Sequence, residues 1–324
     1  MKKLISLFLA AVMALSLFTA CGETESEGTQ TAFTVAIVQQ LDHSSLDEIK
    51  VAIIAEVERL AAERGITVQI ETYNGQNDAS VLNQIGTEVV SEGFDMIIPI
   101  ATTAAQCMVT ASDGQIPIVY AAISDPVGAG LTGMDHVTGV SDALNTPYIL
   151  DMMLAVNPDI RTVGLLYSNS EPNSQTPIAE AKAYLEEKGI AYIEKTGTTA
   201  GEVIEAASAL VGRVDAVFTP TDNAVMAAEA AVAEILNEAG IPHYAGADSF
   251  VQAGAFATCG VNYTELGTCA ARMAMDILAG GEVPEYQLMD GGIITVNTET
   301  AAALGLDYSV FAGQGNTIVE VPVN

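Results

Sequence analysis

Two stretches of the chain repeat one alternation of strand-like and helix-like patterns, and this repeat limits the possible folds more than any other feature. In the first stretch, an apolar run at 33–38 precedes apolar residues at helical spacing over 49–60, and Gly65 is a typical helix stop. The order restarts with an apolar run at 162–167 and a helical pattern that ends at Gly189. Strands that alternate with helices predict a parallel sheet covered by helices, so we predict an α/β fold with one sheet in each stretch.

The two stretches also match in sequence at corresponding places. Residues 63–66 (ERGI) resemble residues 187–190 (EKGI), and residues 94–97 (FDMI) resemble residues 214–217 (VDAV). The matches occur in the same order and at similar intervals. They predict two lobes of the same architecture, each of roughly 100–150 residues.

Some helix boundaries are indicated as well. Asp78 is a favourable N-cap for a helix whose apolar face includes Leu82. In the second stretch, apolar residues from Val225 to Leu236 recur at helical spacing and predict one continuous helix.

The N-terminus has the pattern of a signal peptide at 1–20. Two lysines precede an apolar run over 4–18, which is short for a membrane-spanning helix. The sequence TACG at 19–22 then resembles a bacterial lipobox, which implies a diacylglycerol on the sulfur of Cys21. The alternative is a plain signal peptide with an incidental cysteine. Residues 21–32 are polar and predict a flexible tether.

The charge of the chain excludes one class of partner. The 41 acidic and 11 basic residues give a formal net charge of −30, and such a surface repels nucleic acid. No second apolar run reaches membrane-spanning length. We therefore expect an extracytoplasmic protein that only the lipid on Cys21 holds to the cell membrane.

Three cysteines remain beyond the predicted anchor, at positions 107, 259 and 269. An odd number without paired spacing does not indicate a disulfide framework. A bridge between Cys259 and Cys269 is one interpretation, and three small buried thiols are the one we favour.

Polar residues after predicted strands are the candidate ligand contacts, since ligands of open α/β sheets bind beyond the carboxyl ends of the strands. Thr102 and Thr103 begin a predicted helix directly after an apolar run that ends at Ile100. The free N–H groups and the positive end of a helix attract a carboxylate. The alternative is an ordinary N-cap threonine.

Carboxylates follow other predicted strands. Asp222, with Asn223 beside it, occupies the matching position of the second stretch, and Asp125 and Asp248 follow two further strands. A buried carboxylate forms a strong charge-assisted pair with a ligand ammonium. Asp and Asn are equally common as turn and cap residues, which is the alternative for each.

The first strand of each stretch ends in polar residues too. Gln39 ends the first strand of the first stretch, and Asn169, Ser170 and Glu171 follow that of the second. We expect them to supply hydrogen bonds to a ligand from opposite lobes. The alternative for Glu171 is a solvated loop.

The sequence patterns that indicate catalytic, metal or cofactor sites are incomplete or absent. The glycines at 128, 130 and 133 have dinucleotide-fingerprint spacing, but no helical pattern follows them. The acidic residues around His43 are typical of an exposed helix start rather than a metal site. Neither a zinc-type Cys/His pattern nor a nucleophile elbow occurs. We therefore predict no catalytic residue, no metal, no cofactor and no enzymatic activity.

Several short motifs occur within the stretch from about Phe33 to Leu306, which is nearly the whole chain after the predicted tether. They are IVQ at 37–39, HSSLD at 43–47, ATTAAQ at 101–106, SDPV at 124–127, GVSD at 139–142, LYSNSEPNS at 166–174, PTDN at 220–223 and GVNY at 260–263. Together they resemble the tryptophan/tyrosine-type ABC transporter substrate-binding family, which has the type I periplasmic-binding-protein fold. The chain departs from the family at Ser44-Ser45, where Pro-Ala is usual, and at Asn262, where Asp is frequent.

The resemblance implies two lobes joined by crossing hinge strands. We expect the first lobe to comprise 33–142 plus 262–288, and the second lobe 143–261 plus 289–324. The helical pattern that begins near Leu266 then packs on the first lobe although it follows the second lobe in sequence.

The resemblance also implies a receptor that delivers its ligand to an ABC permease and its ATPase. The implied ligand is a small molecule, an aromatic amino acid, which the lobes enclose by hinge closure. Among the candidate carboxylates, the resemblance favours Asp222 and Asp125 as ligand contacts. A nucleoside or a branched-chain amino acid is an alternative cargo. A sensory ectodomain that partners a membrane receptor is an alternative from another class.

Overall fold

The computed structural model describes residues 32–312 and 316–322. The predicted signal peptide, Cys21 and the predicted tether up to residue 31 lie outside the described residues, whereas Ala32 already belongs to the first strand. Both sheets lie in the same compact unit of the chain, which begins at Ala32.

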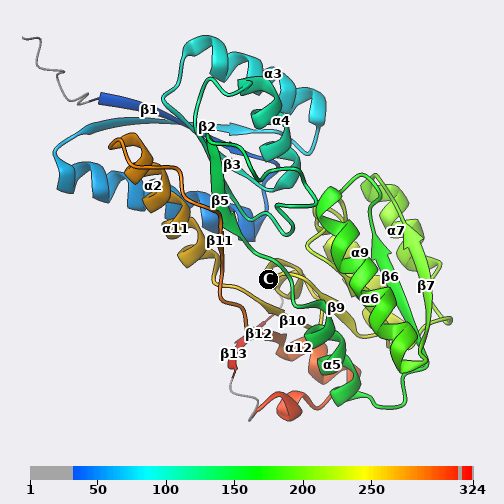
Figure 1. The fold of residues 1–324 in the computed structure, drawn as a ribbon. Helices are drawn as coiled ribbons and strands as arrows, with labels where there is room; N and C mark the ends of the chain where they lie inside the picture. The colour runs from blue at the N-terminus through cyan, green and yellow to red at the C-terminus, as the bar shows by residue number, and fades with distance from the viewer. Residues whose placement is uncertain (1–31, 313–315, 323–324) are drawn as a thin grey trace, which may run out of the picture. The chain divides into compact units, whose positions relative to one another are not determined.

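The first lobe is built on a six-stranded sheet whose strands are all parallel, in the order β11-β5-β4-β3-β1-β2. Helices α2 and α11 pack on one face of this sheet, and α3 and α4 pack on the other (Figure 1). The strands are β1 (Ala32–Gln39), β2 (Thr67–Asn74), β3 (Met96–Ile100), β4 (Ile118–Ala121), β5 (Val137–Ser141) and β11 (Gln287–Leu288). The helices are α2 (Ser44–Arg64), α3 (Ala79–Glu92), α4 (Thr102–Ser112) and α11 (Tyr263–Leu278).

The second lobe is built on a seven-stranded sheet in the order β13-β12-β10-β9-β8-β6-β7, in which only the pair β10 and β12 is antiparallel. Its strands are β6 (Thr162–Tyr167), β7 (Ala191–Thr196), β8 (Ala216–Thr219), β9 (His243–Ala245), β10 (Ala257–Gly260), β12 (Ile293–Asn297) and β13 (Thr317–Val321). Its helices are α5 (Thr146–Val156), α6 (Gln175–Lys188), α7 (Ala200–Ser208), α8 (Asn223–Met226), α9 (Glu229–Glu238), α10 (Asp248–Gln252) and α12 (Thr298–Leu304), with 3-10 turns at Pro172–Ser174 and Tyr308–Phe311. The predicted fold class, two α/β lobes with helix-covered parallel sheets, is confirmed.

The chain passes between the two sheets three times. It leaves the first sheet after β5, returns after β10 to form α11, and leaves again between β11 and β12. The two lobes are therefore joined by three short segments rather than by one linker.

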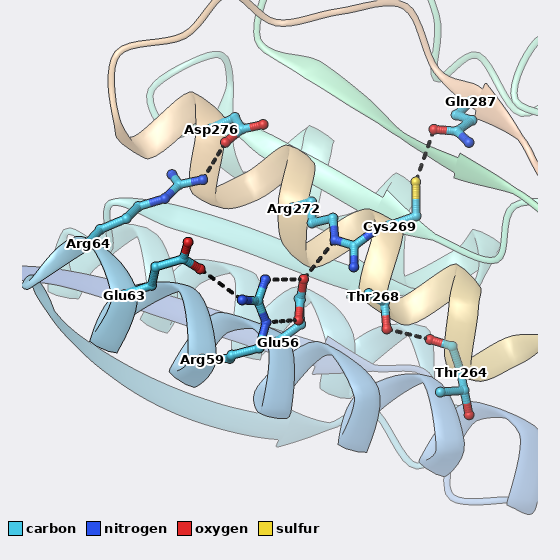
Figure 2. Close-up of polar contacts among 10 residues, drawn as sticks. All are labelled: Glu56, Arg59, Glu63, Arg64, Thr264, Thr268, Cys269, Arg272, Asp276 and Gln287. Carbon is cyan, nitrogen blue, oxygen red and sulfur yellow. Dashed lines mark hydrogen bonds and ion pairs between the residues drawn. The ribbon is translucent and has the colours of Figure 1, made fainter.

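Helix α11 packs closely on α2 and so completes the first lobe. A side chain at Gly267 would place its Cβ 2.6 Å from the carbonyl oxygen of Ile49, so only glycine permits this approach. Nearby, the carboxylate of Glu56 accepts from the Nε of Arg59 and from the Nε of Arg272, both at 2.7 Å (Figure 2). Glu56 thus joins the two helices, and these two arginines hold its pKa at about 2 against the cost of its burial.

The predicted helix limits agree with the structure at three places and fail at one. The side chain of Asp78 accepts from the N–H of Ser80 at 2.7 Å, and Gly65 and Gly189 end their helices in the left-handed conformation, with φ of 66° and 69°. The continuous helix predicted over 225–236 is wrong, because the structure breaks it into α8 and α9. The break places Glu229 in the first turn of α9, where its buried carboxylate contacts the ring of His243 at 3.0 Å.

The cysteines in the described part of the chain are free thiols. Cys259 is buried and Cys107 and Cys269 are half-buried, so the structure has no bridge between Cys259 and Cys269. In the same residues, no helix combines the length and the apolar character that a membrane span requires.

Candidate functional site

A small pocket lies where the two lobes meet, at the carboxyl ends of strands from both sheets. Its volume is about 30 Å³. The first lobe contributes His43, Ser45, Leu46, Ala101, Thr102, Ala122, Ser124 and Asp142, with Tyr263 at the start of α11; the second lobe contributes Asn173, Thr221, Asp222, Asn223, Met226, Ala247 and Phe250.

Three polar atoms of this pocket are buried and have no hydrogen-bond partner among the described residues: His43 Nδ1, Thr102 Oγ1 and Asn173 Oδ1. Each such atom costs about 1–3 kcal/mol of desolvation unless a partner satisfies it. Burial also lowers the pKa of His43, so its ring is neutral near pH 7. The lining therefore presents unsatisfied donors and acceptors from both lobes to whatever occupies the pocket.

Helix α4 points its N-terminus at the pocket. Thr102 is its first residue, and the N-cap is Ala101, whose φ of 77° lies in the left-handed region and whose side chain cannot cap. The alternative that Thr102 is an ordinary N-cap is therefore wrong. The N–H of Thr103 donates to the side-chain oxygen of Gln40 at 3.2 Å. The hydroxyl of Thr102 and the positive helix end remain directed to the pocket.

Asp222 caps α8 on the opposite side of the pocket. Its carboxylate accepts from the N–H of Ser168 at 2.6 Å, the hydroxyl of Ser174 at 2.7 Å and the N–H of Val225 at 2.9 Å. All these donors belong to the second lobe. Although burial raises the pKa of Asp222, its hydrogen-bonding capacity is largely used within its own lobe.

Glu171 lies beside the pocket lining and connects the lobes. Its two oxygens accept from Gln40 Nε2 in the first lobe and Asn223 Nδ2 in the second, each at 3.0 Å. Burial, and then the nearby charge of Asp222, raise the pKa of Glu171 to about 8.

Four further hydrogen bonds cross between the lobes around the pocket. They join His43 to Asn223 (3.3 Å), Ser45 to Asp248 (2.9 Å), Ser124 to Thr221 (3.0 Å) and Thr176 to Asp125 (2.6 Å). The lobes are thus held together at the pocket and at its rim.

The predicted contacts divide into three groups. Thr102, Asp222 and Asn223 line the pocket. Thr103, Glu171, Asp125 and Asp248 lie next to it, in the bonds described above. Gln39 is turned away, with its Nε2 on the carbonyl of Leu41 at 2.6 Å, and Asn169 and Ser170 are exposed at the loop after β6.

Sequence reasoning missed Asp142 and the apolar walls. Phe250 and Tyr263 are 2% and 5% exposed and line the pocket from different lobes. Asp142 follows β5, is 6% exposed, and accepts from the hydroxyl of Ser124 at 3.1 Å; burial raises its pKa to about 6. Its place in the motif at 139–142 marks it as a candidate in the sequence, but the motif alone does not indicate what the carboxylate contacts.

A second cavity lies behind the pocket, at the segments that join the lobes. It measures about 350 Å³, and Asp142 and Tyr263 line both spaces. No group of acidic, histidine and cysteine residues in the described ranges has a metal-binding arrangement.

The sequence model of a family described as ABC transporter substrate binding protein matches residues 34–310. A "Tyrosine-binding protein" of Clostridioides difficile is 31% identical over 322 residues, which cover 94% of this chain and 93% of the relative.

Two solved structures share both sequence and fold. An ABC domain in complex with L-Trp from Streptococcus pneumoniae is 28% identical with a TM-score of 0.82, covering 89% of this chain and 100% of the other. The ligand-free, open structure of a substrate-binding protein with adhesive properties from Clostridium difficile is 31% identical with a TM-score of 0.68, covering 90% of this chain and 100% of the other.

Proposed function

Since the chain belongs to the ABC transporter substrate-binding proteins, a family of binding proteins and not enzymes, we propose that it is the extracytoplasmic receptor of an amino-acid importer. It binds a free aromatic amino acid in the pocket between its lobes. The observation that carries this proposal is the set of buried, unpartnered polar atoms that meet there beside two aromatic walls.

The aromatic ring of the ligand requires apolar surroundings and its carboxylate requires polar ones, and the pocket offers both. Phe250 and Tyr263 provide flat apolar surfaces on which an aromatic ring packs favourably. Thr102 and the N-terminus of α4 provide the hydroxyl and the positive helix end that a carboxylate requires. The relatives described above as tyrosine-binding and as an L-Trp complex support this class of ligand.

Ligand entry requires the lobes to separate. A pocket of about 30 Å³ holds about one or two water molecules, far less than an aromatic amino acid. The closer similarity of this structure to the L-Trp complex than to the open, ligand-free relative supports a closed arrangement. The hydrogen bonds between the lobes then stabilise the closed state, and ligand shifts the equilibrium towards it.

The delivery of the ligand requires an anchor and a transporter. We propose that Cys21 carries the lipid and that a permease with its ATPase accepts the ligand from the closed receptor. The leader pattern before Cys21 supports the anchor.

Thermal-shift measurements with the twenty amino acids, nucleosides and small sugars test the proposal. A ligand that binds only the folded protein raises its melting temperature by mass action, so tyrosine, tryptophan or phenylalanine should give the largest increase. Stabilisation by a nucleoside alone, by a branched-chain amino acid alone, or by none of the compounds contradicts the proposed ligand.

A further inference from the structure

The charged side chains that line the pocket are acidic. Two carboxylates, Asp142 and Asp222, line it, and the lining contains neither lysine nor arginine. The histidine of this lining, His43, is neutral because burial lowers its pKa. Next to these carboxylates, a positively charged group of the occupant is therefore favoured over a neutral or anionic group.

The two carboxylates differ in what already binds them. Asp222 already accepts hydrogen bonds from three donors of its own lobe. Asp142 accepts from one side chain, the hydroxyl of Ser124, and within the described residues no lysine, arginine or histidine forms an ion pair with it. A carboxylate that is buried without a cation is costly, and a cationic partner offsets this cost.

The sheet topology sets a suitable distance between Asp142 and the proposed carboxylate site. Thr102 follows β3 and Asp142 follows β5, and β4 lies between these strands. Adjacent strands are about 4.8 Å apart, so the two positions are roughly 10 Å apart. The ammonium and carboxylate of an α-amino acid are separated by roughly 3 Å, and a hydrogen bond of about 2.9 Å at each end gives a similar span.

We infer that Asp142 receives the α-ammonium group of the ligand, so that the pocket selects molecules with a free amine. This inference rests on the proposed function. Asp142 also links the ligand to the closed state, because it holds Ser124, whose hydroxyl contacts Thr221 across the lobes at 3.0 Å. Asp222 positions α8 and does not pair with the ammonium.

The test compares two ligands and two proteins by isothermal titration calorimetry. The ligands are L-tyrosine and 3-(4-hydroxyphenyl)propionate, which lacks the amine. If the wild type binds tryptophan or phenylalanine better than tyrosine, that amino acid and its own deaminated acid are used as the pair instead. The proteins are the wild type and Asp142→Asn, which keeps the size of the side chain and an oxygen for Ser124. We expect Asp142→Asn to weaken tyrosine binding by about 10- to 100-fold and not to weaken the binding of the deaminated acid, whose carboxylate then meets one negative charge fewer.

The results separate this inference from the proposed function. Tyrosine binding that is equal in the wild type and Asp142→Asn overturns the role of Asp142 but keeps the proposed function. A wild type that binds no amino acid overturns both. Equal losses for both ligands also overturn the inference, because they indicate a structural role. Ser124→Ala keeps the carboxylate, so tyrosine should remain preferred over the deaminated acid, and loss of that preference contradicts the inference as well.

Discussion

Substitution of Thr176 by valine should weaken ligand binding although Thr176 does not line the pocket. Its hydroxyl, on α6 of the second lobe, donates to Asp125 of the first lobe at 2.6 Å. Asp125 stays ionised, because the N–H of Gly128 and then Thr176 lower its pKa. Valine has nearly the same shape as threonine but cannot donate, so the change removes one contact that exists only when the lobes are together.

The expected magnitude follows from the exposure of this bond. A hydrogen bond to a charged group contributes about 1.5–3 kcal/mol when buried, but this one lies at the exposed rim, where water replaces it after opening; we expect about 0.5–1 kcal/mol. Apparent affinity should therefore fall by about 2- to 5-fold, mostly through faster dissociation.

Calorimetry and stopped-flow fluorescence with the best-binding amino acid measure both effects. The matched control is Thr87→Val, which removes a hydroxyl that donates to the carbonyl of Asn83 within α3. If Thr176→Val binds like the wild type, or if Thr87→Val weakens binding equally, the bond at the rim does not stabilise the closed state.

Other changes test other parts of the molecule. Affinity for the amino acid should fall about tenfold per pH unit below pH 6, because burial raises the pKa of Asp142 to about 6 and a protonated carboxyl cannot pair with the ammonium; calorimetry from pH 4.5 to 8 measures this slope. The pKa of Asp142 is higher in the folded protein, at about 6, than its unfolded value of 3.8, so this carboxyl stabilises the fold below about pH 4 and loses that contribution as the pH rises through 6. Asp142→Asn should therefore raise the free energy of unfolding of the ligand-free protein at pH 7 by about 2–3 kcal/mol, as measured by urea unfolding. Gly267→Ala should lower the free energy of unfolding by about 1–3 kcal/mol, because its Cβ meets the carbonyl of Ile49, and an unchanged urea midpoint would contradict this packing. Cys21→Ser should release the protein from membranes or leave it as a precursor in cell fractionation, whereas continued lipid labelling would refute the anchor.

Local patterns predicted the elements of this fold well but could not place side chains across it. The apolar spacing over 49–60 and the glycine at 65 were sufficient to predict α2, because both are properties of one helix and its end. Gln39 and Gln40 show the limit. Neighbouring residues at the end of a strand point to opposite faces, so a shift of one position exchanges a side chain beside the pocket for one turned away from it.

Asp142 could not be assigned for a different reason. Its relation to Thr102 depends on β4 lying between β3 and β5, which is a property of the strand order and of no short sequence pattern. The contact of Glu229 at the start of α9 with His243 likewise forms only in the folded lobe, so the spacing of apolar residues over 225–236 could not indicate it.

The return of α11 to the first lobe affects how the chain reaches its folded state. Residues 263–278 and the short strand at 287–288 complete the first lobe, and both are synthesised after most of the second lobe. A ribosome must therefore make about nine-tenths of the chain before the first lobe is complete, so this lobe cannot fold independently as a finished N-terminal domain during synthesis. A chain that stays incompletely folded until late in its synthesis remains suited to passage through an export channel as an extended polypeptide.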